Sequence, residues 1–508
     1  MPAAADPRRP LLSRAAPIAG ATALAAWGAG LLAVRRPDLV RLDLLEVAAG
    51  PAALAGVLVA ALLAAAVLRR PGLGLLLVVG AIYLNLSEVL VRQHGLPSLL
   101  QLLTLLVAVA ALAERTGDAA AETGPARLRR LALHPLTLAL AAYLLVLLVS
   151  TTLAWDRELA DERGIEAFKA FVLYLLVAQL ASTPRRLAAG ARTVVACAAF
   201  LAALGVVQFA TAGFENELGG LARVKDAHIV GEVFEPRIAG PLGDPNFFAQ
   251  ALLVAVPLAL FAAWEARGRG AHLAALAGAG LVTAAIVLTY SRGGALALGC
   301  VLGLAFLARR VRRGDLALGA ALLAALVVAA PDEFARRLTT LSEVVPGGEE
   351  TLHPDSSFEK RRLLGLVAWE VFLDHPLAGV GAGNYTVHFD RYAAQVGSAA
   401  RQYGEAEERQ YPHNLYLEIA AETGVLGLAA FAAALAAAFA ALLRARRRWE
   451  RAGQGHMAGL AHAFAIALAG YLVSSLFLHG HYQRYLFLLF AFAAALSLGE
   501  PEERPAAA

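Results

Sequence analysis

The sequence predicts an all-α, polytopic integral membrane protein with about 14 transmembrane helices and a large helical loop outside the membrane. Of its 508 residues, 59% are hydrophobic and 17% are charged, and the mean hydropathy is +0.62. This composition lies outside the range of soluble globular proteins, so the chain needs a bilayer. The apolar residues also form long runs, each close to the roughly 20 residues that cross a hydrocarbon core.

The predicted spans fall into three groups. An N-terminal bundle at 16–211 holds spans near 16–34, 47–68, 71–88, 96–113, 131–154, 165–182 and 190–211. A central group at 245–330 holds spans near 245–264, 271–289, 293–308 and 314–330. A C-terminal group at 413–499 holds spans near 413–443, 457–478 and 482–499. The total is 12 to 14, about 14 by the length criterion, and the first pair of helices is the weakest assignment.

The positions of the arginines predict the orientation of the helices. Basic connections stay cytoplasmic, and here they fall on alternate connections: Arg8, Arg9, Arg69, Arg70, Arg127–Arg130, Arg185, Arg186, Arg267, Arg269, Arg309–Arg313 and Arg444–Arg451. The group Arg35, Arg36 and Arg41 departs from this pattern, with acidic residues among it. We therefore expect cytoplasmic tails at 1–15 and 500–508, with polar loops at 212–244 and 331–412 on the opposite, periplasmic side.

Several kinds of chemistry are not expected. Cys197 and Cys300 lie inside predicted spans, so neither a disulfide framework nor a thiolate metal site is indicated. The net charge of +4 comes from cytoplasmic arginines that suit anionic membrane lipids, not nucleic acid. The stretch 479–482 (HGHY) resembles a ligand pair, but two histidines in a short external turn favour an interfacial or structural role. The sequence predicts no metal and no cofactor.

The first informative stretch, 236–250 (PRIAGPLGDPNFFAQ), places a cation in a turn of Gly and Pro before a predicted span. Arg237 would lie at the external boundary and Asn246 at the helix start. A guanidinium offers bidentate donors to phosphate oxygens, and a helix start adds backbone N–H groups and a favourable dipole. The stretch alone predicts an anion site as readily as a capped helix with an interfacial arginine.

The second stretch, 288–296 (LTYSRGGAL), carries Arg292 within apolar sequence where two successive helices meet. Gly293 and Gly294 permit close approach of another segment. A cation at this depth normally faces the protein interior or a water-filled cavity and is a candidate functional residue. The alternative is an anchor at a helix end.

The third stretch, 411–428 (YPHNLYLEIAAETGVLGL), ends the large loop and begins a span. His413 lies where the large loop meets this predicted span, and a histidine is suited to take a proton from a sugar hydroxyl near neutral pH. Glu418 and Glu422 follow on one helical face, and two such carboxylates need partners such as arginines. In the alternative interpretation, His413 and Asn414 only cap the helix.

Two further features lie inside the large loop. Residues 358–374 predict a helix that could lie along the membrane surface, with Leu363, Val367 and Val371 on one face. Residues 375–385 (HPLAGVGAGNY) contain Asn384. Taken in chain order, the stretches 236–250, 288–296, 375–385 and 411–428 resemble the O-antigen ligase and polymerase superfamily. Arg361 best matches an arginine that the family commonly carries before the HP segment, although Gly365 replaces a tryptophan often found just after it.

The resemblance implies a metal-independent, inverting glycosyltransferase that moves an undecaprenyl-diphosphate-linked glycan to an acceptor sugar such as the lipid A core. By analogy, Arg237 and Arg292 bind the diphosphate and His413 activates the acceptor hydroxyl. The expected supporting residues of the site are Asn246, Arg361, Asn384, Asn414, Glu418 and Glu422. A repeat-unit polymerase and a protein O-oligosaccharyltransferase remain alternatives. A lipid-linked glycan transporter is disfavoured, because the candidate residues cluster at one face and the two halves of the chain are unlike.

Overall fold

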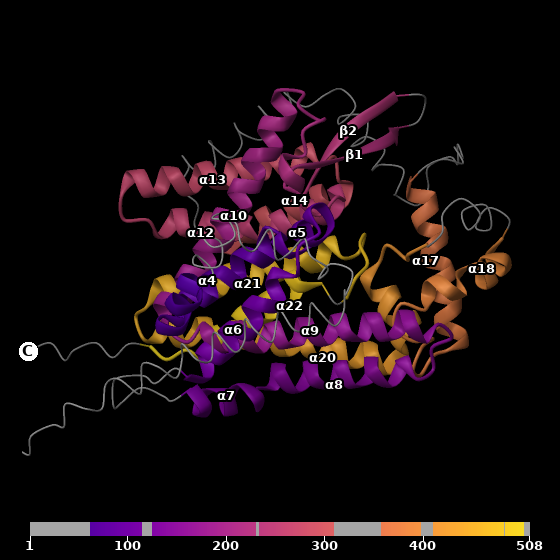
Figure 1. Ribbon diagram of the computed structural model, residues 1–508, viewed down its shortest axis with the longest axis horizontal. Helices are drawn as coiled ribbons and strands as arrows, with labels where there is room; N and C mark the ends of the chain where they lie inside the picture. The colour runs from indigo at the N-terminus through magenta and orange to yellow at the C-terminus, as the bar shows by residue number, and fades with distance from the viewer. Residues whose placement is uncertain are drawn as a thin grey trace, which may run out of the picture.

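A computed structural model describes residues 61–113, 124–229, 233–308, 357–397, 410–481 and 483–501. Within these ranges the chain is a bundle of helices with one short β-hairpin at its edge (Figure 1). The predicted spans at 16–34 and 314–330, and most of the span at 47–68, lie outside the described residues.

In the first half of the bundle, several of the helices that the structure describes begin at a local sequence signal. The helices described in this half are α4 (Pro71–Tyr83), α5 (Leu86–His94), α6 (Leu99–Ala113), α7 (Gly124–Ala132), α8 (Pro135–Thr151), α9 (Arg157–Leu180) and α10 (Pro184–Ala210). Proline occupies the first turn of α4, α8 and α10, where its missing N–H costs no hydrogen bond. The Asp156 side chain caps α9 by accepting from the Leu159 amide at 3.0 Å.

The second half forms the remainder of the bundle. Its helices are α11 (Pro245–Leu253), α12 (Ala255–Glu265), α13 (Arg269–Leu288), α14 (Arg292–Ala308), α20 (Leu415–Arg451), α21 (Gly455–Ser474) and α22 (Arg484–Leu498). Every residue of α22 from Tyr485 to Leu496 is buried, and α22 packs against α9, α20 and α21. A helix that is apolar on all sides belongs inside a bundle, so α22 is the central helix of the fold.

Five helical segments are long and apolar enough to cross a membrane. They are Pro184–Ala210, Pro245–Glu265, Arg269–Leu288, Leu415–Arg451 and Gly455–Ser474. Two bent pairs, α4 with α5 at 57° and α7 with α8 at 63°, raise the number to seven if each pair is one span. The predicted membrane helices are confirmed in this coarser form for the described residues. The predicted 12 to 14 is not reached there, partly because α6, α14 and α22 are shorter helices.

The prediction of an all-helical chain misses one element. The connection at 212–244 contains a 3-10 turn η1 (Leu218–Gly220) and an antiparallel hairpin of β1 (Arg223–Ile229) and β2 (Val233–Gly240). In its register Val224 pairs with Ile238 and Lys225 with Arg237. Ile238 is fully buried and packs at Gly205 of α10, so the hairpin is fastened to the end of the bundle.

The predicted helix at 358–374 is confirmed as α17 (Ser357–Asp374), followed by α18 (Tyr385–Val396). Val367 and Val371 are fully buried in a small apolar cluster with Tyr385 and Phe389 of α18. This cluster also includes Ala421 of α20. The two outer helices are therefore attached to the bundle through the beginning of α20.

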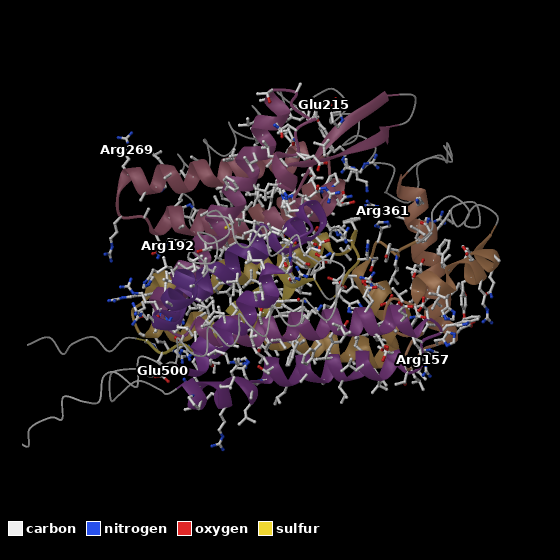
Figure 2. All side chains as sticks on the ribbon, in the orientation of Figure 1. Arg157, Arg192, Glu215, Arg269, Arg361 and Glu500 are labelled. Atoms are coloured by element: carbon white, nitrogen blue, oxygen red, sulfur yellow. The ribbon has the colours of Figure 1, made fainter. Side chains whose placement is uncertain are left out.

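Charged connections lie at one end of the bundle. Several of the helices that carry the informative stretches of the sequence begin toward the other end. Figure 2 shows Arg269 and Glu500 at one end of the long axis, with Arg157 and Arg361 toward the opposite end. At the first end, Arg130 pairs with Glu500 at 2.9 Å, and Arg448 donates to the carbonyl of Leu496 at 2.9 Å. The arginine-rich connections that the sequence puts on one side thus meet in space.

Candidate functional site

The start of α11 is built by the acidic residue that precedes it. Asp244 Oδ1 accepts from the backbone amides of Asn246 at 2.8 Å and Phe247 at 3.3 Å. Asp244 Oδ2 lies 3.2 Å from Lys225 Nζ. Burial would raise the pKa of the Asp244 carboxyl, but Lys225 and the two amides outweigh it and hold that pKa below its ordinary value. The helix start therefore carries a fixed negative charge beside Asn246.

Arg237 connects the first informative stretch to the second. Its Nε donates to the Thr289 carbonyl at 2.8 Å, and a terminal nitrogen lies 3.5 Å from Asn246 Oδ1. Thr289 follows the last residue of α13, three residues before Arg292. These contacts orient a half-buried guanidinium where α13 ends and α11 and α14 begin. Arg237 and Asn246, predicted to lie together at a helix start, do so.

The second stretch forms a tight turn into α14. Tyr290 adopts a left-handed φ of 50°, and Ser291 Oγ accepts from the Gly294 amide at 3.1 Å. A Cβ on Gly294 would lie 2.8 Å from Ala249 of α11, and one on Gly293 would lie 2.9 Å from Phe477. The glycines therefore allow the close approach that the sequence predicted, and they place Arg292 at the junction of α11, α14 and the segment after α21.

Arg361 on α17 belongs to the same cluster of charges. Burial lowers the pKa of its guanidinium, and Arg292 lowers that pKa further, whereas the carboxylate of Asp244 raises it. Arg361 is labelled in Figure 2, between the hairpin and α17. Two neighbouring arginines repel each other, so their juxtaposition produces a local positive potential that attracts anions such as phosphates.

His413 lies directly before α20 in a strained backbone conformation, with φ at 48°. Asn414 caps the helix: its Oδ1 accepts from the amides of Tyr416 and Leu417, both at 3.0 Å. Its Nδ2 donates to the Leu476 carbonyl at 3.1 Å, which joins the start of α20 to the end of α21. The capping interpretation thus applies to Asn414. Left-handed non-glycine residues store strain and are concentrated at functional sites, which keeps His413 as the chemical candidate.

His479, in the turn between α21 and α22, is a site residue that sequence reasoning missed. Its ring stacks on Tyr411 with centroids 4.3 Å apart and planes at 8°. It meets His413 edge-on at 5.2 Å and Phe247 at 5.3 Å. Burial, and after it the neighbouring His413, lower the pKa of His479 to about 3. The charges of Asp244 and Arg361 also act on it, so His479 contacts His413 and lies within the electrostatic reach of both Asp244 and Arg361.

Glu418 and Glu422, for which the sequence predicted partners such as arginines, have both an arginine and a histidine as neighbours. Glu418 Oε2 accepts from the Gly480 amide at 2.6 Å, and His481 Nε2 lies 3.4 Å from Glu422 Oε2. Burial lowers the pKa of His481, opposed by Glu418 and reinforced by Arg163 of α9. Arg163 thus acts on both carboxylates as well as on His481, and Glu422 also accepts from the backbone amides of Gly383 and Tyr385. Glu418, Glu422 and His481 are buried, with possible ligand atoms within 4.8 Å of one another, so this group could hold a metal ion.

The loop at 375–384 fills a break in α20. Inside that helix Gly424 has φ 63° and ψ −162°, which interrupts the helical hydrogen bonds. The loop completes them with four bonds, Val380 N to Ala421 O at 3.0 Å, Gly381 N to Glu422 O at 3.0 Å, Val425 N to Pro376 O at 2.8 Å and Leu426 N to Leu377 O at 3.3 Å. The loop and the start of α20 therefore form one unit.

Asn384 is fully buried at the end of this loop and holds the loop in place through its side-chain hydrogen bonds. Its Oδ1 accepts from the Asp156 amide at 2.8 Å, and its Nδ2 donates to the Asp156 carbonyl at 3.0 Å. These bonds tie the loop to the capping residue of α9. The sequence placed Asn384 among the supporting residues, and its described contacts are all with the protein backbone.

Comparison with known proteins gives one family match. The family described as O-antigen ligase matches residues 273–432, which include Arg292, Arg361 and His413. Arg237 and Asn246 precede the matched segment. No curated protein matches the chain. The match supports activity of the ligase or polymerase type and confirms the resemblance seen in the sequence.

Proposed function

We propose that this chain, whose residues 273–432 match the O-antigen ligase family, transfers a glycan from undecaprenyl diphosphate to an acceptor sugar, with the lipid A core as acceptor. The reaction would take place at the periplasmic face of a bacterial inner membrane. The observation that carries the proposal is the convergence of Arg237, Arg292 and Arg361 with the ring pair His413 and His479 at one end of the bundle.

The three arginines suit the leaving group of this reaction. The bond from the anomeric carbon to the diphosphate breaks and leaves its electron pair on a phosphate oxygen. Guanidinium groups stabilise that developing charge through planar, charge-assisted hydrogen bonds. Arg237 and Arg292 would hold the diphosphate, and Arg361, which shares the electrostatic environment of Arg292, would add to the field. The start of α14, where Arg292 and Gly293 are the first helical residues, adds the positive end of its dipole, whereas Asp244 already occupies the amides at the start of α11.

His413 would supply the base. Its imidazole would take the proton of the acceptor hydroxyl as the hydroxyl oxygen attacks the anomeric carbon, from the face opposite the diphosphate. Such a displacement inverts the anomeric configuration. It needs one base and one cationic site for the leaving group, and no step requires a metal ion. The contact of His413 with His479, whose pKa responds to Arg361, supports a role for His413 close to the cations.

A direct test uses purified protein with an undecaprenyl-diphosphate-linked glycan, in EDTA, with lipid A core and a second lipid-linked repeat unit as competing acceptors. We expect transfer to the core, and we expect Arg292→Ala to eliminate it. Arg269→Ala is the matched control, because Arg269 lies at the opposite end of the bundle (Figure 2). Chain extension of the repeat unit would identify a polymerase. Transfer to neither acceptor by folded protein would point to a protein acceptor or to transport, and loss of transfer in EDTA would refute metal independence.

A second test separates the base from the binding site. His413→Ala should abolish transfer while the affinity for the lipid-linked donor persists, because the arginines remain. His456→Ala is the control, since His456 is exposed at the start of α21. Unchanged turnover in His413→Ala would remove His413 from the role of base.

A further inference from the structure

The turn between α21 and α22 carries two histidines that face in different directions. Gly480 separates His479 from His481 and has φ 95°, a conformation that glycine adopts without strain. The Gly480 amide donates to Glu418 Oε2 at 2.6 Å, which fastens the middle of the turn to α20. The residues on either side of Gly480 are thereby held in fixed directions.

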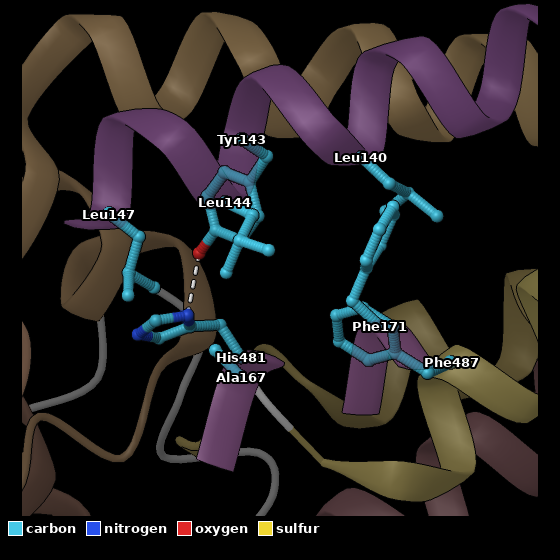
Figure 3. A pocket seen from close by; sticks show the side chains of 8 residues that line it. All are labelled: Leu140, Tyr143, Leu144, Leu147, Ala167, Phe171, His481 and Phe487. Carbon is cyan, nitrogen blue, oxygen red and sulfur yellow. Dashed lines mark hydrogen bonds between the residues drawn. The ribbon is translucent and has the colours of Figure 1, made fainter. Parts of the chain in front are cut away.

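His481 anchors the turn in the interior of the bundle. Its Nδ1 lies 2.6 Å from the hydroxyl of Tyr143 on α8 (Figure 3). Its Nε2 lies 3.4 Å from Glu422 Oε2. Apolar side chains of α8, α9 and α22 line the adjoining pocket, among them Leu147, Ala167 and Phe487. Both ring nitrogens of His481 have a polar partner and the side chain is fully buried, so His481 holds the turn against the interior of the bundle.

His479 lies on the other side of the turn, against the candidate base. We propose that His479 is a positioning residue of the glycosyl-transfer site, which holds the His413 ring in its reactive orientation through the stack with Tyr411. The proposal rests on the function proposed above. It gives Glu418, Glu422 and His481 a supporting role, because they hold the turn that presents His479.

The packing explains how His479 would act. Its parallel stack on Tyr411 restricts rotation of its ring, and its edge-on contact restricts the ring of His413. The Nδ1 atom of His479 is buried and has no hydrogen-bond partner among the described residues. The contacts that orient His479 are therefore ring contacts.

These contacts predict different effects for two substitutions. His479→Ala removes the ring and should lower kcat by about tenfold or more, because small errors in orientation are costly to catalysis. The KM for the lipid-linked donor should stay within about twofold of wild type, because the arginines are unchanged. His479→Phe keeps a flat ring and should restore kcat to within about threefold of wild type. His456→Ala is the matched control.

Two kinetic results would overturn the proposal. Wild-type kcat in His479→Ala would show that the ring is not needed. A kcat in His479→Phe below about a tenth of wild type would show that the ring nitrogens, not the ring shape, are required. If His479→Ala fails to fold, the result for His479→Phe still decides.

A measurement independent of transfer activity separates this proposal from the proposed function. Diethyl pyrocarbonate acylates accessible imidazoles, and mass spectrometry follows its reaction at His413. We expect faster modification of His413 in His479→Ala than in wild type, and the wild-type rate in His479→Phe. Equal rates in wild type and His479→Ala would refute positioning. Protection of His413 by His479 in a protein that transfers no glycan would instead refute the proposed function alone.

Discussion

The break in α20 is a position where one methyl group should disrupt the site. Gly424 has φ 63° and ψ −162°, a backbone conformation that L-residues with side chains rarely adopt. A Cβ at this position would lie 2.4 Å from the Leu377 carbonyl carbon, which is backbone and cannot rotate away. Gly424→Ala must therefore displace the loop at 375–384, the helix, or both.

The magnitude follows from these contacts. The backbone strain costs roughly 1–3 kcal/mol. Displacement of the loop would break the bonds from Val425 N to Pro376 O and from Leu426 N to Leu377 O, at about 1 kcal/mol each. The sum is roughly 3–5 kcal/mol, a large fraction of the stability of a typical protein. At the lower limit, opening of the loop becomes more frequent by about a hundredfold.

Two assays measure this effect. Hydrogen exchange at 376–384 and 421–426 should accelerate, and thermal unfolding, followed through dye labelling of Cys197 and Cys300, should occur several degrees lower. Gly303→Ala is the matched control, because Gly303 is helical on α14 and an added Cβ there would meet nothing within 4 Å. That variant should be as stable as wild type or slightly more stable, given the better helix propensity of alanine. Wild-type exchange and unfolding in Gly424→Ala would refute the reasoning.

Three other predictions concern single contacts of the site. Arg237→Lys should lower transfer by about tenfold with little change in unfolding temperature, because an ammonium cannot make both the Thr289 and the Asn246 contact; wild-type turnover would contradict this role. Asn384→Ala should destabilise the protein by roughly 1–3 kcal/mol with donor affinity unchanged in the folded fraction, whereas weaker donor binding without destabilisation would make Asn384 a binding residue. The pKa of His479 is about 3 in the folded protein and 6.5 ordinarily, so the unfolded chain gains a proton first as pH falls, and below 6.5 this residue reduces stability. The contribution of His479 to the free energy of unfolding falls by up to about 1.4 kcal/mol per pH unit down to about pH 3. Unfolding temperatures between pH 4.5 and 7.5 should therefore depend less on pH in His479→Phe than in wild type. Equal pH dependence in the two proteins would argue against the low pKa.

The spans and helix starts could be predicted because their causes are local. A bilayer needs long apolar segments, and 190–211, 245–264 and 271–289 have them; the structure has α10, α11 with α12, and α13 at these places. Capping is also local, which is why Asn246 lies in the first turn of α11 and Asn414 caps α20 as expected. The hairpin at 223–240 was missed, because charged residues such as Lys225 and Asp226 obscure the alternation that marks a half-buried strand.

The partners within the site could not be predicted, because they depend on which distant segments meet. The sequence placed Glu418 and Glu422 on one helical face and predicted partners such as arginines, but it identified neither Arg163 of α9, which acts on both carboxylates, nor His481, beyond α21, which contacts Glu422. The same connection, between α21 and α22, also brings His479 into contact with His413. Spacing along the chain carries no sign of either contact. Only the connection from α21 to α22, folded back over the start of α20, makes two interfacial-looking histidines part of the site.

The break at Gly424 also resolves a conflict between the length of α20 and the thickness of a membrane. A helix of 37 residues is about 55 Å long, almost twice the hydrocarbon thickness of about 30 Å. Residues 425–443, after the break, match the length of one span, whereas the predicted span at 413–443 begins before the break. The segment before the break carries Glu418 and Glu422, packs against α17 and the loop at 375–384, and belongs to the site. Two buried carboxylates in a membrane helix thus need not cross hydrocarbon, because the glycine that interrupts α20 separates the chemical part of the helix from the spanning part.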